Sequence, residues 1–433
     1  LSCVFGTMTT AQLQPPATPA FYMYPDLFPK PDVLLGCRGL KRLAPFGEPM
    51  AQFYSELGLH RALAAHPSRV HDPSLASVFY IPILPHMDQD AGRCNGTGHR
   101  KRMERVADAL RSSPHWQRAN GTDHFYACAC VMMKSMLTSG LWSLLSAAAH
   151  AVHSVPRMRA SPSACELTLP YYNPAFARVP EAPEWRVPGR TRPLLAHFRG
   201  RVMNRVRGQL VRAYGHAPTH LIQAAHPSTA ARCNLNKCKP ASMRKVNFSA
   251  SGHFEEMKSA TFCLVPVGDS PPSSRLYLAV AAGCIPVFIS DGFGGAFPSS
   301  VPWNAFSLRF AEAQLVKGRV GSGLRVVNLT RELLAVAADP PRLHSMQAAL
   351  QTHAVDVLWE APGSRVGEHT LALAGLAIGS VCPEGRAQAR SRAPRGPADA
   401  AADSTAETHR TRASVPAELL QPVQVRYDDV AAS

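Results

Sequence analysis

Short apolar runs alternate with segments of helical periodicity along the first half of the chain. Residues 78–84 form an apolar run that predicts a buried strand, and residues 52–65 carry apolar positions near one face, which predicts a helix before it. Residues 168–172 predict a short extended segment. The apolar stretch 141–155, interrupted at Ser143, His150 and His153, predicts a buried helix. Strands that alternate with helices in this way are typical of α/β folds.

A clearer strand–helix unit opens the second half of the chain. Residues 193–198 predict a strand that turns at residues 199–201. Residues 204–214 predict the helix that follows, and Gly215 suits the position just after its last turn. A strand followed by a helix is one half of a parallel crossover.

A second unit of the same kind has better-defined ends. Residues 261–265 predict a buried strand, and Ser273 or Ser274 can cap the helix that follows and runs to Ala282. Residues 284–289 predict the next strand. A strand, a helix and a strand within about 30 residues specify a parallel, right-handed crossover. The chain is therefore predicted to be an α/β protein with two doubly wound domains and a cleft between them.

Composition divides the chain into four segments. Residues 1–20 and 381–433 are rich in small and polar residues without apolar periodicity, so we expect both to be disordered. A Pro-rich, charged stretch between residues 174 and 193 predicts a domain boundary. One Rossmann-like domain is thus expected over residues 21–185 and another over residues 186–380.

The charge of the chain lies on its expected folded part. The formal net charge is +16, whereas the segment from Glu384 onward holds seven Arg against seven Asp plus Glu. A basic folded body favours anionic ligands such as nucleotide diphosphates, acidic glycans or nucleic acid, although a solvated basic surface has the same charge. The alternation of aromatic and basic residues typical of RNA-binding motifs is missing, so no nucleic-acid partner is expected.

Cysteines and glycosylation sequons favour the secretory pathway. The chain has 11 Cys and four Asn-X-Ser/Thr sequons, which begin at Asn95, Asn120, Asn247 and Asn328. No CxxC pair is present, so disulfides are expected rather than zinc. No apolar run reaches the ~18 residues of a membrane span. The sequence opens with Leu rather than Met, so a membrane anchor can precede its first residue.

The loop that leads into the second predicted crossover helix suits a diphosphate. Ligands of doubly wound sheets bind at the carboxyl ends of the strands, where the next helices begin. This loop contains Gly268 and Asp269, and it ends in the hydroxyls and backbone N–H groups of Ser273 and Ser274, next to the Arg275 guanidinium. Short donors, a forked cation and a helix N-terminus attract phosphate. The alternative is an ordinary capped helix with a surface arginine.

Arginines are also concentrated around the first strand–helix unit. Six lie within 21 residues: Arg192, Arg199, Arg201, Arg205, Arg207 and Arg212. Some of them belong to a solvated helix face. Arg199 and Arg201, in the expected turn, are the better candidates for holding an anion.

Two neighbouring segments carry a family resemblance. Residues 257–277 read MKSATFCLVPVGDSPPSSRLY, and residues 282–288 read AGCIPVF. Together they resemble the signature of the exostosin family (GT47), roughly S-x-FCL-x-P-x-GD-x-P-x-S-x-RL followed by GCIPV. Further blocks resemble the family in the same order: Tyr22–Pro25, Glu56, Asp72–Ala76, Phe79–Pro82, Trp116–Phe125, Leu194–Gly200 and Phe297–Trp303. The resemblance covers about residues 21–360.

The resemblance implies a GT-B fold, with two Rossmann-like domains facing a cleft, the acceptor in the first and a nucleotide sugar in the second. It implies an inverting glycosyltransferase that moves a sugar from a UDP-linked donor to a polysaccharide or glycoprotein glycan. It also implies residence in the lumen of the Golgi or endoplasmic reticulum, a membrane anchor, and homo- or heterodimers. GT-B enzymes hold the diphosphate without a bound metal, so no metal and no cofactor are expected, and the positive charge must come from the arginines, hydroxyls and loop named above.

An inverting transfer needs a base that takes the proton of the acceptor hydroxyl. Asp123 and His124 are the leading candidates, because they lie between a Trp-containing segment and a predicted helix over residues 124–137. The structural alternative is that Asp123 caps that helix. The other candidates in the first domain are Glu56, His86 and Asp88.

Two rival functions follow from single features. Asp88-Gln-Asp90 is a DxD, the sequence with which metal-dependent GT-A enzymes bind manganese and diphosphate. Leu278 stands where the exostosin family usually has an acidic residue, which favours a member that binds glycan or assists a partner without turnover. A test of UDP binding distinguishes such a member without turnover from an active enzyme.

Overall fold

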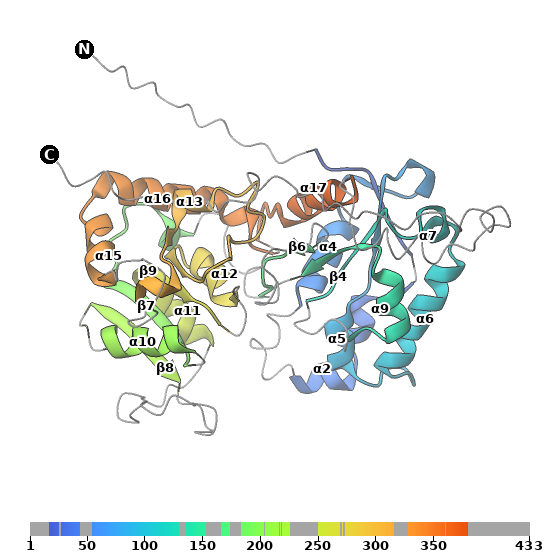
Figure 1. The fold of residues 1–433 in the computed structure, drawn as a ribbon, viewed down its shortest axis with the longest axis horizontal. Coiled ribbons are helices and arrows are strands. Elements are labelled where there is room, and N and C mark those ends of the chain that lie inside the picture. Colours follow the sequence, from blue (N-terminus) through green and yellow to red (C-terminus); the bar gives the residue numbers. More distant parts are fainter. Residues whose placement is uncertain are drawn as a thin grey trace, which may run out of the picture. The chain divides into compact units, whose positions relative to one another are not determined.

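The computed structural model describes the following residues: 17–25, 27–43, 54–129, 136–152, 166–173, 183–202, 204–215, 217, 219–225, 250–268, 271, 273–315, 328–359 and 361–379. All of them belong to one compact unit, Leu1–Ala389, which contains two parallel sheets (Figure 1). The predicted disordered tail lies outside the described residues. Residues 17–20 are among those described: the Thr18 and Ser68 hydroxyls are hydrogen-bonded, and Ala20 O accepts from Ser77 N.

The first sheet has the strand order β2-β1-β3-β4-β5-β6, and every pair in it is parallel. Its strands are short: β1 (Phe21–Met23), β2 (Arg69–Val70), β3 (Val78–Ile81), β4 (His124–Ala127), β5 (Ala149–Val152) and β6 (Glu166–Thr168). The helical segments of this part are α1 (Pro31–Leu35), α2 (Arg38–Leu43), α4 (Ser55–Ala64), η2 (Pro73–Leu75), α5 (Pro85–Ala91), α6 (His99–Ser112), α7 (Pro114–Ala119) and α9 (Ser139–Leu145).

The second sheet has the order β11-β10-β9-β7-β8, again with parallel pairs throughout. Its strands are β7 (Leu194–Arg201), β8 (His220–Ala225), β9 (Ala260–Pro266), β10 (Ile285–Ile289) and β11 (Leu308–Arg309). The helical segments of this half are η4 (Glu184–Arg186), α10 (Arg205–Tyr214), α11 (Ala250–Lys258), α12 (Ser274–Ala281), α13 (Trp303–Phe306), α14 (Glu312–Leu315), α15 (Leu329–Ala337), α16 (Pro340–His353), η7 (Ala354–Asp356) and α17 (Val366–Gly379).

Counted from its own first strand, each sheet has the doubly wound order 2-1-3-4-5, and the first sheet adds a sixth strand at its edge. The predicted fold class, α/β with two doubly wound parallel sheets, is confirmed. In such a sheet the second strand lies on one side of the first strand, and the third strand lies on its other side. The crevice outside the carboxyl ends of the strands at this point is where ligands bind.

The second predicted crossover is confirmed almost residue for residue. Strands β9 and β10 are adjacent, and nearly all their side chains are buried, as in other parallel sheets covered on both faces. Ser273 caps α12 by accepting a hydrogen bond from Arg275 N. Gly283, which follows the helix, has a φ of 63°, a conformation that glycine adopts without steric cost. A disulfide between Cys263 and Cys284 joins β9 to the residue before β10.

Three sequence predictions are wrong. The stretch 141–155 is not one helix: α9 ends at Leu145, and the chain then forms β5 between β4 and β6. The helix expected over residues 124–137 begins instead as the buried strand β4, so Asp123 caps no helix there. The expected turn at residues 199–201 is the end of β7, which pairs with β8 through Arg201. Short apolar runs fit a strand and a buried helix equally well, and pairing with neighbouring strands decides between them.

The last described helix, α17, packs against elements of the first sheet. It contacts α4, β5 and β6, and Figure 1 shows it near α4 and β6. Just before it, Trp359 is almost fully buried and donates a hydrogen bond from Nε1 to Pro170 O, next to the end of β6. The segment assigned from sequence to the second domain therefore ends on the first sheet, while the boundaries 21–185 and 186–380 remain predictions. No described helix combines the length and apolar character that a bilayer crossing requires.

Candidate functional site

The topology selects one edge of each sheet. We call the edge at which the parallel strands end the carboxyl edge. In the second sheet the winding changes direction between β7 and β9, and in the first sheet between β1 and β3. A ligand is therefore expected outside the ends of β7 and β9, and a second binding region outside the ends of β1 and β3.

Two side chains of α10 hold the loop that follows β9. Asn204 caps α10 by accepting from Arg207 N, and its amide nitrogen lies 2.8 Å from Val267 O and 3.2 Å from Gly268 O. Arg207 is buried and donates from Nε to Val267 O at 2.9 Å. These hydrogen bonds hold the carbonyls of Val267 and Gly268 in place. Of the two predicted loop residues, Gly268 is half-buried here and Asp269 lies outside the described residues.

Arg275 lies between the end of β7 and the start of α12. Its guanidinium donates to Arg199 O at 2.6 Å and lies 4.8 Å from the centre of the Phe198 ring. A Cβ atom on Gly200 would come within 2.7 Å of it, so the glycine at this position makes room for the cation. The side chain is only 9% exposed, and Nε has no hydrogen-bond partner within the described ranges.

A cationic cluster surrounds Arg275. His197 and Arg199 follow at alternate positions of β7, and His253 and Glu256 come from α11. Glu256 forms an ion pair with Arg199 and accepts from His197 Nε2 at 3.2 Å. Burial, aided by the charges of Arg275 and Arg199, lowers the pKa of His253 to about 3, so its imidazole stays neutral at pH 7. Burial, with a smaller contribution from Arg207, lowers the pKa of Arg275 to about 9, which still leaves it charged.

Three buried nitrogens of this cluster have no partner among the residues that the structure describes: His197 Nδ1, His253 Nε2 and Arg275 Nε. Buried polar atoms are nearly always hydrogen-bonded, and each exception needs an explanation such as a bound water, ion or ligand. An anion against Arg275 would accept a hydrogen bond from its Nε. It would also offset the cost of burying the Arg199 and Arg275 guanidinium groups close together.

The other residues predicted to bind the nucleotide sugar differ in their surroundings. Ser273 and Ser274 form the N-cap and first residue of α12, as predicted, and both are partly exposed. Arg199 is in a strand rather than a turn, and Glu256 already neutralises it. Arg201 is the last residue of β7, and its side chain lies outside the described residues. The phosphate-binding role of all of them remains a prediction, which the geometry favours most for Arg275 and the start of α12.

The carboxyl edge of the first sheet is organised by Glu56. This residue lies in the first turn of α4 and is fully buried. Its carboxylate accepts from Met87 N at 2.7 Å and from Ala129 N at 3.4 Å, which ties α4 to the start of α5 and to the residues after β4. Burial raises the pKa of Glu56 well above its usual range, against the lowering effect of these backbone donors. With no exposed surface, Glu56 is a positioning residue rather than a base that contacts an acceptor.

His86 lies at the same edge, in the first turn of α5 after β3. Its Nε2 is 3.7 Å from Asp90 Oδ2, one helical turn away, and Tyr54 OH donates to the same oxygen at 2.9 Å. Burial lowers the pKa of His86, which keeps the imidazole neutral near pH 7, while Asp90 opposes the shift. His86 is itself only 8% exposed, so it can serve as a general base only for a hydroxyl that reaches its ring.

Asp123 and His124 are at the beginning of β4, away from the carboxyl edge. His124 is fully buried, and both its ring nitrogens are engaged, with Asp123 Oδ1 at 2.6 Å and with Tyr24 OH at 2.7 Å. It also stacks on Phe79. Asp123 is held by Arg118 at 2.7 Å. The catalytic role predicted for this pair remains untested: His124 is enclosed, whereas Asp123 is partly exposed and ion-paired with Arg118.

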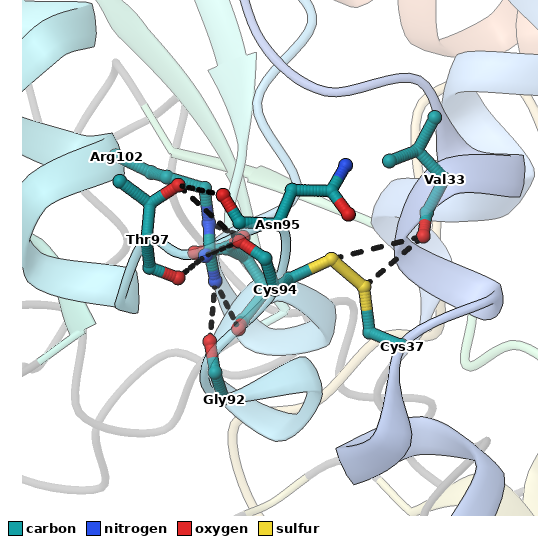
Figure 2. The surroundings of a disulfide bond; sticks show 8 residues. Val33, Cys37, Gly92, Cys94, Asn95, Thr97 and Arg102 are labelled. Carbon is teal, nitrogen blue, oxygen red and sulfur yellow. Dashed lines mark hydrogen bonds and ion pairs between the residues drawn. A yellow bond between two sulfur atoms is a disulfide. The ribbon is translucent and has the colours of Figure 1, made fainter.

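Asp88, the first aspartate of the DxD, is part of a buried ion pair. It is fully buried and accepts from Arg102 Nε and from His99 Nδ1, both at 2.6 Å. Figure 2 shows the rest of this network, in which Arg102 reaches Gly92 O and the Cys94–Thr97 turn beside the Cys37–Cys94 disulfide. Among the described residues no cluster of His, Cys, Asp and Glu has the make-up of a metal site. Asp88 therefore stabilises the fold.

Replacing Asp88 with Asn is expected to lower the free energy of unfolding by about 3 kcal/mol, because it leaves the buried Arg102 charge without its partner. Urea denaturation measures the loss. Asp108→Asn is the matched control, since Asp108 forms an exposed pair with Arg111 and its loss changes stability little. Mn²⁺ is expected to leave the Tm of the parent unchanged; a Mn²⁺-dependent rise that disappears in Asp88→Asn would mean that the DxD binds metal.

Leu278 packs against the core of the second half rather than facing solvent. It is half-buried on α12, one turn after Arg275, and contacts the cluster formed by Met257, Cys263 and Cys284. Leu278 thus makes a core contact at the position where an acidic residue is expected. Glu256, the carboxylate of the cationic cluster, is already paired with Arg199 and His197.

Comparison with known proteins gives consistent relatives. The Exostosin GT47 domain model matches residues 21–326. A probable beta-1,4-xylosyltransferase IRX10 of Arabidopsis thaliana is 27% identical over 60% of this chain and 62% of its own length. A probable glucuronosyltransferase GUT1 of Oryza sativa subsp. japonica is 27% identical over 60% of this chain and 61% of its length. The chain thus matches about three fifths of the length of these relatives.

Among solved structures, the glycotransferase of kitacinnamycin has a TM-score of 0.29 and 13% identity over 83% of this chain and 99% of that chain. A similarity of this size supports no conclusion.

Proposed function

The chain belongs to the exostosin GT47 family, and on that premise we propose that it transfers a sugar from a UDP-linked donor to a polysaccharide or glycoprotein glycan. The relatives named above as xylosyl- and glucuronosyltransferases support UDP-xylose and UDP-glucuronic acid as the first donors to try. The observation that carries the proposal is the cationic cluster at the carboxyl edge of the second sheet, in which Arg275 and two histidines present buried nitrogens without a partner in the described part of the chain.

In the proposed reaction the pyrophosphate lies against α12. Backbone N–H groups of its first turn, the hydroxyls of Ser273 and Ser274, and the Arg275 guanidinium stabilise the negative charge that grows on UDP as it leaves. These groups are fixed before the substrate arrives, because Ser273 caps the helix and Arg275 is held on Arg199 O. Fixed donors need no reorganisation during the reaction, which makes them effective.

The acceptor hydroxyl attacks the anomeric carbon on the face opposite to UDP. The bond from this carbon to the acceptor oxygen forms while the bond to the phosphate oxygen breaks, so the configuration inverts. The hydroxyl proton passes to a base, for which we propose His86, oriented by Asp90. Glu56 positions the first turn of α5, on which His86 lies. Asp123 and His124, the pair preferred from sequence, are not used in this scheme.

A donor screen tests the proposal. The chain is incubated with UDP-xylose, UDP-glucuronic acid, UDP-glucose, UDP-galactose and UDP-N-acetylglucosamine, with and without oligosaccharide acceptors, and released UDP is measured. At least one donor is expected to release UDP faster with acceptor than without. The proposal fails if no donor reacts and UDP itself does not bind.

The second candidate function, a glycan-binding member without turnover, is favoured by Leu278 alone. Such a protein would bind oligosaccharide without binding UDP, so calorimetry with both ligands separates the two functions.

Transfer is proposed to be independent of divalent metal, because Arg275 and the donors at the start of α12 would supply the positive charge that a metal otherwise gives to the diphosphate. We expect an excess of EDTA to leave the rate of UDP release within about twofold of the untreated rate, the scale of a small change in barrier. Activity that is lost in EDTA and returns with Mn²⁺ would contradict this prediction. Residence in the Golgi lumen, an anchor and a dimer remain part of the proposal.

A further inference from the structure

Two surface turns of the first half have the same sequence and the same backbone shape. One is Asn95-Gly96-Thr97 and the other is Asn120-Gly121-Thr122. Asn95 and Asn120 have φ values of 47° and 49°, and the glycines after them have values of 75° and 78°. Two successive residues with positive φ form the tight turn for which Asn-Gly is the preferred pair.

The first turn is held from both ends. Cys94 and Thr97 exchange two backbone hydrogen bonds, of 2.9 and 3.0 Å, and Cys94 is disulfide-bonded to Cys37. Figure 2 shows Asn95 at the tip of this turn beside the disulfide. Asn95 is exposed, and no atom lies within 4 Å of the place where a Cβ on Gly96 would be. The tip is therefore open to solvent.

The second turn ends α7. Asn120 is the C-cap residue, and it is exposed. Gly121 lies against Trp116, where a Cβ would approach the indole within 2.2 Å, so this turn is fixed from its inner side. Thr122 Oγ1 donates to Ala119 O at 2.8 Å. In both turns the asparagine points outward from a rigid support.

A third sequon differs in its surroundings. The side-chain oxygen of Asn328 accepts from Arg331 N and caps α15, while Thr330 Oγ1 bonds to His220. This asparagine and its hydroxyl partner both serve the fold. The sequon at Asn247 lies outside the described residues.

We propose that Asn95 and Asn120 carry N-linked glycans. The Cys37–Cys94 and Cys263–Cys284 disulfides indicate an oxidising compartment such as the one in which sequons are modified. The modification joins Nδ2 of the asparagine to the anomeric carbon of an oligosaccharide, breaks the bond from that carbon to a lipid pyrophosphate, and releases the lipid pyrophosphate and the amide proton. Bulky, hydrated sugars fit at exposed turn tips without displacing the core.

The experiment produces the full chain behind a cleavable secretion signal in a eukaryotic host. Peptide N-glycosidase removes the glycans and converts each occupied asparagine to aspartate, which mass spectrometry of peptides detects. Thr97→Ala and Thr122→Ala each remove one acceptor motif, Thr97→Ser and Thr122→Ser keep it, and Asn304→Gln changes an exposed asparagine outside any sequon.

We expect aspartate at positions 95 and 120 in the parent chain, the loss of one gel-mobility step in each alanine variant, and no loss in the serine variants or in Asn304→Gln. Finding the peptides around residues 95 and 120 unmodified would overturn the proposal. Peptides report occupancy even where a variant folds poorly, and the readout does not involve transferase activity, so this result and the donor screen stand independently.

Discussion

Arg275→Met weakens the binding of UDP by roughly 10²-fold. The parent side chain offers a buried, forked cation, and a hydrogen bond from a charged group contributes about 1.5–3 kcal/mol. Losing one or two such bonds corresponds to about one to four factors of ten in Kd. Isothermal titration calorimetry with UDP measures the change. Met keeps much of the side-chain volume, so the contact with Phe198 is partly retained.

Arg275 also joins β7 to α12, so a structural role must be distinguished from ligand binding. Arg275→Lys keeps the charge but loses the fork, and we expect it to bind UDP with intermediate affinity at nearly the parent Tm. Arg212→Met, on the exposed side of α10, removes a neighbouring arginine that has no predicted contact with the donor. If Arg275→Met has a lowered Tm but binds UDP as tightly as Arg212→Met, the arginine serves the fold alone.

His86→Gln lowers kcat by about 10²–10⁴-fold, the range in which a positioned general base contributes. Glutamine has a similar size and polarity but accepts no proton at the pH of the assay. The effect is expected in kcat rather than in the Kd for UDP. His86 lies beside the first sheet, whereas the cationic cluster that is proposed to bind UDP lies at the second sheet. His71→Gln is the control, since His71 is exposed.

The pH profile gives a second readout of the same role. A base works in its neutral form, and burial lowers the pKa of His86 below 6.5. In the parent, kcat/KM is therefore expected to fall as the pH drops through this lowered pKa and to be constant above it. His86→Gln loses that acidic limb. An unchanged limb in the variant, or a kcat equal to that of His71→Gln, would assign the base to another group.

The second crossover could be predicted from sequence because its signals are local. An apolar run, a Pro-rich loop, a serine cap and Gly283 follow one another within 30 residues, and the structure confirms them as β9, α12 and β10. The sequences of β4 and β5 fit helices as well as strands, because nearly all their side chains are buried. Buried strands lack the alternation that marks a half-exposed strand, so only pairing identifies them.

The candidate site was predictable only in part, for a similar reason. Arg275 and Ser273 lie within one short motif. The partners of Arg199 and Glu56 are distant in the chain: Glu256 is 57 residues from Arg199, and Ala129 is 73 residues from Glu56. No spacing rule connects residues that the sheet topology brings together. The position of Asp123 and His124 could not be predicted either, because residues 124–137 fit a helix in the sequence, whereas β4 places both residues at the beginning of a strand.

A structure of the complex with UDP shows where the diphosphate binds. Its pyrophosphate is expected within hydrogen-bond distance of Arg275 and of the backbone N–H groups at the start of α12. A pyrophosphate bound at any other place, with Arg275 still enclosed and out of reach, would contradict this expectation.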